Sequence, residues 1–339
     1  MNLYRNSCRV LCKRLNDPRA RAIGALASVL ILGCFFNQNG SFFHWGTHRD
    51  LLRQISVYGI LSCGMTLVIL GGGIDLAVGS VLGLSAVVFS LLSIHLKVSV
   101  GMAISATLGV GLAAGLASGL LVARFSMQPF IATLAMMVFG RGLAKALAGG
   151  QKISSAVADA HGTIEYVTLP RIFEILDHKV WGGNIAVVTL VFGACSLVTW
   201  LLVSRLRWGR YIIAVGGNEE AARLSGVPIA RTKFLVYGLS GLFTAIAGVC
   251  QAVQEQQGDP EAGVSYELTA IAMVVIGGNS LMGGRGGMGL TLMGIMTIGY
   301  LDKILSMNAI GESSRLMLTG IIIVAAVLLQ GQQSQNLRS

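Results

Sequence analysis

The chain has 339 residues, of which 54% are hydrophobic and only 12% are charged, and its mean hydropathy is +0.72. Soluble domains carry roughly 25% charged residues, so this composition excludes an ordinary soluble protein. The formal net charge is +10, and 12 of the 25 Lys and Arg residues lie within residues 5–21 and 205–233. Basic clusters beside apolar runs mark cytoplasmic segments of membrane proteins, so the charge indicates topology in a lipid bilayer rather than nucleic-acid binding.

Long apolar runs predict an all-α polytopic transmembrane bundle, because a membrane β-barrel needs short alternating segments instead. The runs place ten candidate helices, at residues 21–37, 51–71, 77–96, 98–123, 130–148, 184–204, 234–254, 266–282, 288–305 and 315–330. Eight full crossings with two partly crossing segments fit the same parity, so the prediction is 8 to 10 helices. An even number places both termini in the cytoplasm.

Three divisions of the chain follow from this topology. Residues 1–20 form a basic cytoplasmic segment, residues 21–330 the membrane domain with an inner loop at 205–233, and residues 331–339 a cytoplasmic tail. Five helices in each half, entering from opposite sides, permit an inverted repeat. The echo between VILGG at 68–72 and VIGG at 275–278 is its sequence support.

The first candidate site is a glycine-rich interruption between two apolar runs. Residues 71–73 are three consecutive glycines, and Asp75 follows them. Broken backbone at membrane depth occurs inside a bundle or along a water-filled path, and intramembrane acids are functional candidates. We therefore predict that Gly72, Gly73 and Asp75 lie near a translocation path. Asp75 can equally act as the N-cap of the next helix, and the two roles are compatible.

A second glycine-rich junction covers residues 277–287, and its Asn279 is a further candidate for the path. A nucleotide-binding loop would need a Gly-Lys pair followed by Ser or Thr, and the chain contains no Gly-Lys pair. A tight cytoplasmic turn between two helices is the better interpretation. The sequence shows no nucleophile with a base, no metal-ligand set and no cofactor motif within the spans, which argues against an enzyme or a metal site.

The inner loop at 205–233 predicts a short helix in the cytoplasm. Asn218 suits the N-cap, Glu219 and Glu220 suit the first turn, and Gly226 with Pro228 ends the helix. Such a helix has about two turns and is roughly 10 Å long. It is either a solvated hairpin or a projection that docks on a cytosolic partner.

Four sequence motifs, which occur along the chain in the same order as in a known family, carry a resemblance to that family. Glu220-Ala221-Ala222 followed by Gly226 resembles the EAA-type coupling loop of ATP-binding cassette (ABC) importer permeases. GGGIDLAVGS at 71–80, QPFIATLAMMVFGRGLA at 128–144 and YELTAIAMVVIGGNSLMGGRGG at 266–287 resemble the monosaccharide permeases for ribose, galactose, arabinose and xylose. The similarity extends from about residue 50 to 330. Ala77 and Met282 stand where that family often has serine, so the motifs do not identify the sugar.

The resemblance implies a permease subunit in a bacterial inner membrane that moves a monosaccharide or small polyol. It implies three kinds of protein partner: a second permease chain, identical or different, a cytosolic cassette subunit that binds ATP and Mg, and a periplasmic or tethered sugar-binding protein. This chain itself would need no cofactor. Its coupling residues would be Glu220, Ala221, Ala222, Arg223 and Gly226. An ion- or proton-coupled sugar carrier is the alternative, although Asp75 is the one clear intramembrane acid for it.

Overall fold

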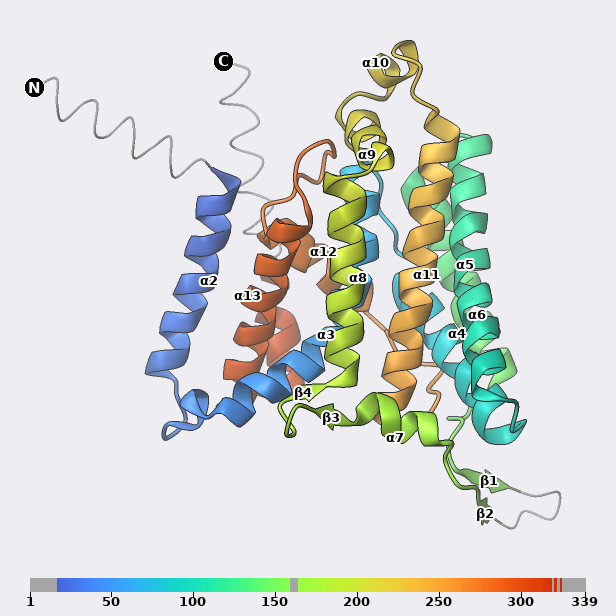
Figure 1. Ribbon diagram of the computed structural model, residues 1–339, viewed down its shortest axis with the longest axis vertical. Coiled ribbons are helices and arrows are strands. Elements are labelled where there is room, and N and C mark those ends of the chain that lie inside the picture. The colour runs from blue at the N-terminus through green and yellow to red at the C-terminus, as the bar shows by residue number, and fades with distance from the viewer. Residues whose placement is uncertain (1–16, 159–163, 319, 322–323, 325–339) are drawn as a thin grey trace, which may run out of the picture.

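The computed structural model describes residues 17–158, 164–318, 320–321 and 324. The chain is mostly helical, and its long helices run side by side in one bundle (Figure 1). Almost all of the basic N-terminal segment and the whole of the tail at 331–339 lie outside the described residues.

The helices are α2 (Pro18–Phe35), α3 (Trp45–Leu70), α4 (Val78–Ser90), α5 (Val100–Arg124), α6 (Pro129–Leu147), α7 (Arg171–Asp177), α8 (Val187–Ser204), α9 (Arg207–Gly217), α10 (Glu219–Leu224), α11 (Ile229–Glu255), α12 (Tyr266–Ile276) and α13 (Met288–Met307). A 3-10 turn η1 (Ser41–Phe43) precedes α3, and a π turn η2 (Leu91–His95) extends α4. Two antiparallel hairpins pair β1 (Ala156–Ala158) with β2 (Ile164–Tyr166) and β3 (Lys179–Val180) with β4 (Ile185–Ala186).

The structure confirms a polytopic helical membrane protein. In the described part of the chain, eight helices are long and apolar enough to cross a membrane, namely α2, α3, α4 with η2, α5, α6, α8, α11 and α13. The apolar helix α12 is shorter. Residues 312–318 are helical, and much of the predicted last helix lies outside the described residues.

The predicted helix boundaries differ most from the structure at α12 and α3. The expected helix 266–282 already ends at Ile276, because Gly277 and Gly278 follow and Gly278 has a φ of +102°, which a helix cannot contain. The expected helix 51–71 begins earlier, at Trp45. The loop expected at 150–183 contains a hairpin and the short helix α7, which the sequence analysis did not anticipate.

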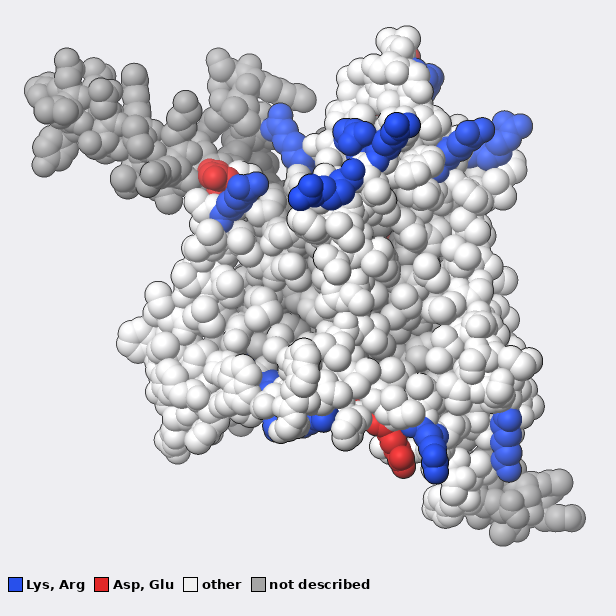
Figure 2. All heavy atoms as spheres, in the orientation of Figure 1, with Lys and Arg blue, Asp and Glu red and all other residues white. Residues whose placement is uncertain are grey.

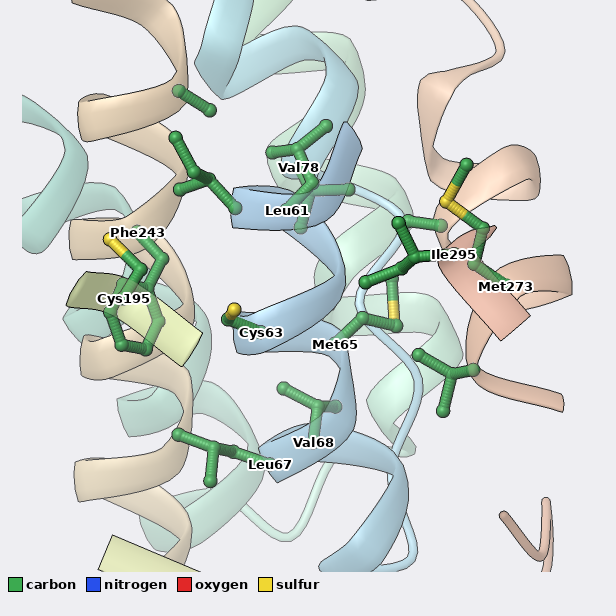
Figure 3. Close-up of a cluster of buried hydrophobic side chains, with 14 of the residues drawn as sticks. Leu61, Cys63, Met65, Leu67, Val68, Val78, Cys195, Phe243, Met273 and Ile295 are labelled. Carbon is green, nitrogen blue, oxygen red and sulfur yellow. The ribbon is translucent and has the colours of Figure 1, made fainter. Parts of the chain in front are cut away.

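The core lies where α3, α4 and α11 meet, and Figure 3 shows part of it around Cys63 and Met65 of α3. Glycines allow the backbones to approach closely: a Cβ on Gly241 of α11 would lie 2.8 Å from the Cα of Gly115 in α5. Close helix contact of this kind replaces the hydrophobic effect as the source of packing energy inside a membrane. By contrast, α2 and α6 leave most of their surface exposed.

Two crossings of the bundle are interrupted, and they lie against each other. In the first interrupted crossing (residues 71–90), a non-helical segment at 71–77 precedes α4. In the second interrupted crossing (residues 256–276), the segment at 256–265 precedes α12. In Figure 1, α12 lies nearer the end of the bundle that carries α9 and α10, and α4 lies nearer the opposite end. The inverted repeat stays a prediction, and two broken crossings of opposite direction are what such a repeat would produce.

The second interrupted crossing follows α4 from its far end back toward its first turn. A Cβ on Gly258 would meet the carbonyl of Ala86, and a Cβ on Gly83 would lie 2.7 Å from the carbonyl of Ala262. At the first turn of α4, Gly79 lies directly against Gly263. Side chains larger than hydrogen would separate these backbones, so glycine is required at the contact.

Candidate functional site

Asp75 lies in the first interrupted crossing and is buried, with 4% of its surface exposed. One carboxylate oxygen accepts a hydrogen bond of 3.0 Å from the backbone N–H of Ala77. The other accepts a bond of 2.7 Å from the hydroxyl of Ser240 in α11. The carboxylate therefore fastens the broken segment to α11 and supports the start of α4.

The prediction for Asp75 needs one correction. The N-cap residue of α4 is Ala77, and Asp75 bonds this residue from two positions earlier rather than capping the helix itself. The cavity beside Asp75 holds only about 10 Å³, which is too small for a sugar. In this conformation Asp75 does not line an open path, and its role in translocation stays a prediction.

Asn279 stabilises the glycine-rich turn at 277–287 through hydrogen bonds. Its amide donates to the carbonyl of Val274 at 2.8 Å and to the hydroxyl of Thr291 at 3.0 Å, and its oxygen accepts from the N–H of Gly287 at 2.6 Å. Thr291 in turn lies 2.8 Å from the hydroxyl of Thr66 in α3. Asn279 thus joins the turn at 277–287 to two helices, and the structure gives it a bracing position; its contact with a substrate stays a prediction.

The predicted short helix of the inner loop is present as α10. The Asn218 side chain accepts a hydrogen bond of 3.0 Å from the N–H of Ala221, which confirms the expected N-cap. After Ser225 the chain turns at Gly226, whose φ is +77°. Glu219 forms an ion pair of 2.7 Å with Lys233 of α11, which ties α10 to the bundle. The amphipathic helix α9, which precedes α10, was not expected from the sequence.

The side chains of α10 divide between the bundle and the solvent. Ala222 is 5% exposed, so it packs within the permease, and its part in coupling stays a prediction. Glu220 and Arg223 are exposed and form an ion pair of 3.4 Å with each other. Leu224 is 82% exposed, which the sequence analysis missed. An apolar side chain so exposed on an ordered helix is a candidate contact for a partner.

Glycines from three segments meet at the end of α9. We call this contact between the three segments the glycine junction (Gly72, Gly216, Gly217, Gly283 and Gly284). The N–H of Gly284 donates to the carbonyl of Leu70 at 3.0 Å. A Cβ on Gly283 would lie 2.8 Å from the Cα of Gly72, and one on Gly216 would collide with the carbonyl of Leu70. The end of α9 therefore rests directly on the start of the first interrupted crossing.

A cavity of about 310 Å³ opens beside the glycine junction. Its walls include the predicted path residues Gly72 and Gly73, the loop residues Asn218 and Glu219, and Tyr237 of α11. The structure thus brings two separately predicted regions to one place. Asp75 and Asn279 do not line this cavity.

One end of the molecule is strongly basic, and α9 and α10 belong to it (Figure 2). The exposed basic residues of this basic end include Arg205, Arg207, Arg210, Arg223 and Arg231. At the opposite end, basic residues pair with acids: Lys145 lies 2.6 Å from Glu261 and Lys152 lies 2.9 Å from Asp259. This asymmetry is the one that the positive-inside rule describes.

The bundle, its two interrupted crossings and the helical loop seated on the glycine junction define a polytopic membrane transport subunit. Among the described residues, no group of three or more His, Cys, Asp or Glu side chains forms a metal site. The chain belongs to the family described as branched-chain amino acid transport system / permease component, whose model matches residues 48–327. Members of this family are transmembrane components without a catalytic role of their own.

Several permeases are similar to the chain over most of its length. The ribose import permease protein RbsC of Escherichia coli (strain K12) is 33% identical over 308 residues, which is 91% of this chain and 92% of that protein. RbsC of Bacillus subtilis (strain 168) is 39% identical over 296 residues, or 87% and 88%. The L-arabinose transport system permease protein AraH of Escherichia coli (strain K12) is 34% identical over 291 residues, or 86% and 84%. No solved structure matches the chain significantly.

Proposed function

We propose that this chain is the membrane-spanning permease subunit of an ATP-driven importer for a monosaccharide or a small polyol. Its similar relatives include import permeases whose names specify ribose and L-arabinose. The family description names branched-chain amino acids. The proposal that the substrate is a sugar and not an amino acid therefore rests on these relatives and on the motifs at 71–80, 128–144 and 266–287.

The observation that carries this proposal is the position of α10. A capped helix projects from the basic end, is tied to α11 by Lys233, and rests through α9 on the glycine junction. A rigid connection of this kind suits a surface that receives a push from a cytosolic ATPase, which would bind ATP and Mg. Leu224 fits an apolar pocket of that partner, while Glu220 and Arg223 orient the contact through charge.

The rest of the assembly follows from the same orientation. The basic end faces the cytoplasm of a bacterium, both termini lie on that side, and the bundle sits in the inner membrane. A second permease chain completes the translocation path. A sugar-binding protein docks at the opposite end, beside the loops at 150–183 and 255–265.

An ion- or proton-coupled carrier fits the structure less well. Such a carrier needs an acid that exchanges ions with water, and Asp75, the acid that the sequence offers for this role, is engaged by Ser240 and Ala77 beside a cavity of about 10 Å³. We propose ATP as the source of energy because of the EAA-type motif at 220–226, which α10 presents at the basic end.

The proposal is tested in proteoliposomes that contain the permease with its ATPase and binding protein. We expect ATP-dependent uptake of at least one of D-ribose, L-arabinose and D-galactose, no uptake of L-leucine, and no effect of ionophores. Uptake of L-leucine alone would reject the sugar assignment. Sugar uptake without ATP that ionophores abolish would reject the ABC assignment in favour of the carrier.

Variants in α10 test the coupling surface. Leu224→Asp removes the exposed apolar contact, and Gly226→Pro cannot adopt the φ of +77° that the turn requires. Both should abolish co-purification of the ATPase, or uptake, while the bundle stays folded. Ala222→Arg is less informative because Ala222 is buried. Arg231→Gln changes an exposed residue of the same end and is the matched control. Normal assembly and uptake in both α10 variants would reject the coupling assignment.

A further inference from the structure

A third cavity, of about 330 Å³, lies between the two interrupted crossings and α6. It shares no lining residue with the cavity beside the glycine junction, and no predicted site residue belongs to it. Its lining residues are Ser80, Met137, Val138, Arg141, Val264, Ser265 and Glu267. Four of them are polar or charged, which is unusual for a cavity among transmembrane helices.

Arg141 of α6 is held in place by the second interrupted crossing. One guanidinium nitrogen donates to the carbonyl of Ala262 at 2.8 Å and also to the carbonyl of Pro260. A guanidinium has five N–H donors, so these two bonds leave donors that can face the cavity. The position of Arg141 is therefore fixed by backbone atoms, which preorganises its remaining donors for a ligand.

Glu267 faces Arg141 from the first turn of α12. Arg141 attracts its carboxylate electrostatically, and a Cβ on Gly79 would collide with a carboxylate oxygen of Glu267. The carboxylate thus lies at the contact of the two interrupted crossings. Ser80 and Ser265 add one hydroxyl from each crossing to the same cavity.

The cavity opens toward the exposed face of α6. Val138 and Phe139 of that face are 65% and 63% exposed. Arg141 and Glu267 would be costly to place against lipid tails, because charged groups in a bilayer face protein or water. The α6 face next to the cavity therefore borders a water-filled path or a second permease chain instead of lipid.

We propose that this cavity is a low-affinity binding subsite for a monosaccharide on its way through the permease. Glu267 accepts hydrogen bonds from sugar hydroxyls, Arg141 donates to them, and Val138 and Val264 contact the C–H faces of the ring. A volume of about 330 Å³ is at the lower end of the range for small-molecule sites. The lining contains no aromatic ring, so the sugar binds weakly and leaves readily. This inference rests on the proposed function and adds the place where the sugar binds.

A protection experiment tests the subsite on the full-length permease in nanodiscs. The starting variant keeps the buried Cys63, Cys195 and Cys250. It carries Ser in place of the exposed Cys34 and in place of Cys8 and Cys12 of the N-terminal segment, so that these thiols do not react with the label. Val264→Cys, at the cavity, is labelled with a charged methanethiosulfonate reagent in the presence of millimolar D-ribose, L-arabinose or D-galactose. Trp181→Cys, exposed and remote from the cavity, is the control.

We expect at least one of the three sugars to slow labelling of Val264→Cys and to leave Trp181→Cys unchanged. Glu267→Gln should raise the sugar concentration that gives half protection by about tenfold, because a hydrogen bond to a charged acceptor is lost. Glu174→Gln, an exposed acid of α7, is the matched control and should change nothing. A merely structural role of Glu267 would alter labelling without sugar but not the half-protecting concentration.

Uptake by the wild-type complex separates this inference from the proposed function. If the complex imports one of the three sugars but none of them protects Val264→Cys, the subsite is rejected and the permease assignment stands. If a sugar protects but the complex imports none of them, the subsite is supported and the importer assignment is rejected. Equal protection in wild-type and Glu267→Gln backgrounds rejects the role of Glu267.

Discussion

The two interrupted crossings share a design but differ in how their acidic residue is used. In the first, the Asp75 carboxylate is buried and both of its oxygens accept hydrogen bonds from the protein. In the second, Glu267 is partly exposed and lines a cavity of about 330 Å³ beside Arg141. The acid beside a broken helix can thus be fully enclosed or partly exposed. The packing around the acid, more than the break itself, distinguishes the two cases.

The contact between the crossings should be the most sensitive point of the comparison. Gly79→Ala introduces a methyl group against the backbone of Gly263 and the carboxylate of Glu267. We expect a loss of about 3 kcal/mol in stability, since overpacking forces the backbones apart. Gly109→Ala in α5, where no atom lies within 4 Å of the new Cβ, is the control. Thermal unfolding in one detergent compares them, and similar melting temperatures would show that the crossings move apart easily.

Asp75→Ala should cost more than Glu267→Ala. The first change leaves the Ser240 hydroxyl and the Ala77 N–H without their acceptor in a buried site, which costs about 2 kcal/mol. The second removes a partly exposed group and should cost less than about 1 kcal/mol. Denaturation midpoints of the two variants provide the measurement. Asp75→Asn, which keeps one acceptor, should fold and should impair transport if the charge serves the path; normal transport would assign Asp75 a structural role alone.

Ser240→Ala should have a smaller effect, of about 1 kcal/mol, because it removes one hydrogen bond from the Asp75 carboxylate. Since both residues act through the same bond, the effects of Ser240→Ala and Asp75→Ala should not add. A double-mutant cycle on the unfolding free energy measures this coupling. Additive losses would mean that the 2.7 Å contact contributes little.

The smallest effect is expected at the outer loop of the second crossing. The exposed Lys152 forms an ion pair with the mostly buried Asp259, and the hydrogen bond to Asp259 raises the pKa of Lys152. From neutral pH up to the ordinary pKa of lysine, any stabilisation from this pair is therefore complete, and it is lost as the pH rises above that pKa. Lys152→Met should melt almost as wild type at neutral pH. A large decrease at neutral pH would contradict this account.

Composition was enough to predict the class of fold, and the three glycines before Asp75 were enough to predict the break. The residue types at 218–220 predicted the N-cap at Asn218. These features depend on neighbouring residues, so the sequence shows them directly. The end of α12 at Ile276 was missed although Gly277, Gly278, Asn279 and Ser280 interrupt the apolar pattern, because the apolar Leu281 and Met282 beyond them were counted in the same helix. The cavity of Arg141 and Glu267 was missed because its residues come from separate helices, and no spacing rule connects them. The burial of Ala222 was not predicted, since it depends on the packing of α10 against the neighbouring helices.

The shortness of α12 has a consequence for how the protein is made. Eleven residues form a helix of about 16 Å, roughly half of the 30 Å hydrocarbon core. The ten residues before it include Asp259 and Glu261 and form no helix of their own, so this crossing cannot partition into lipid by itself. Its backbone is hydrogen-bonded by Arg141 of α6 and by Ile153, which are both synthesised earlier. The second half of the chain must therefore enter the bilayer against a first half that is already in place, and the order of synthesis becomes part of the folding mechanism.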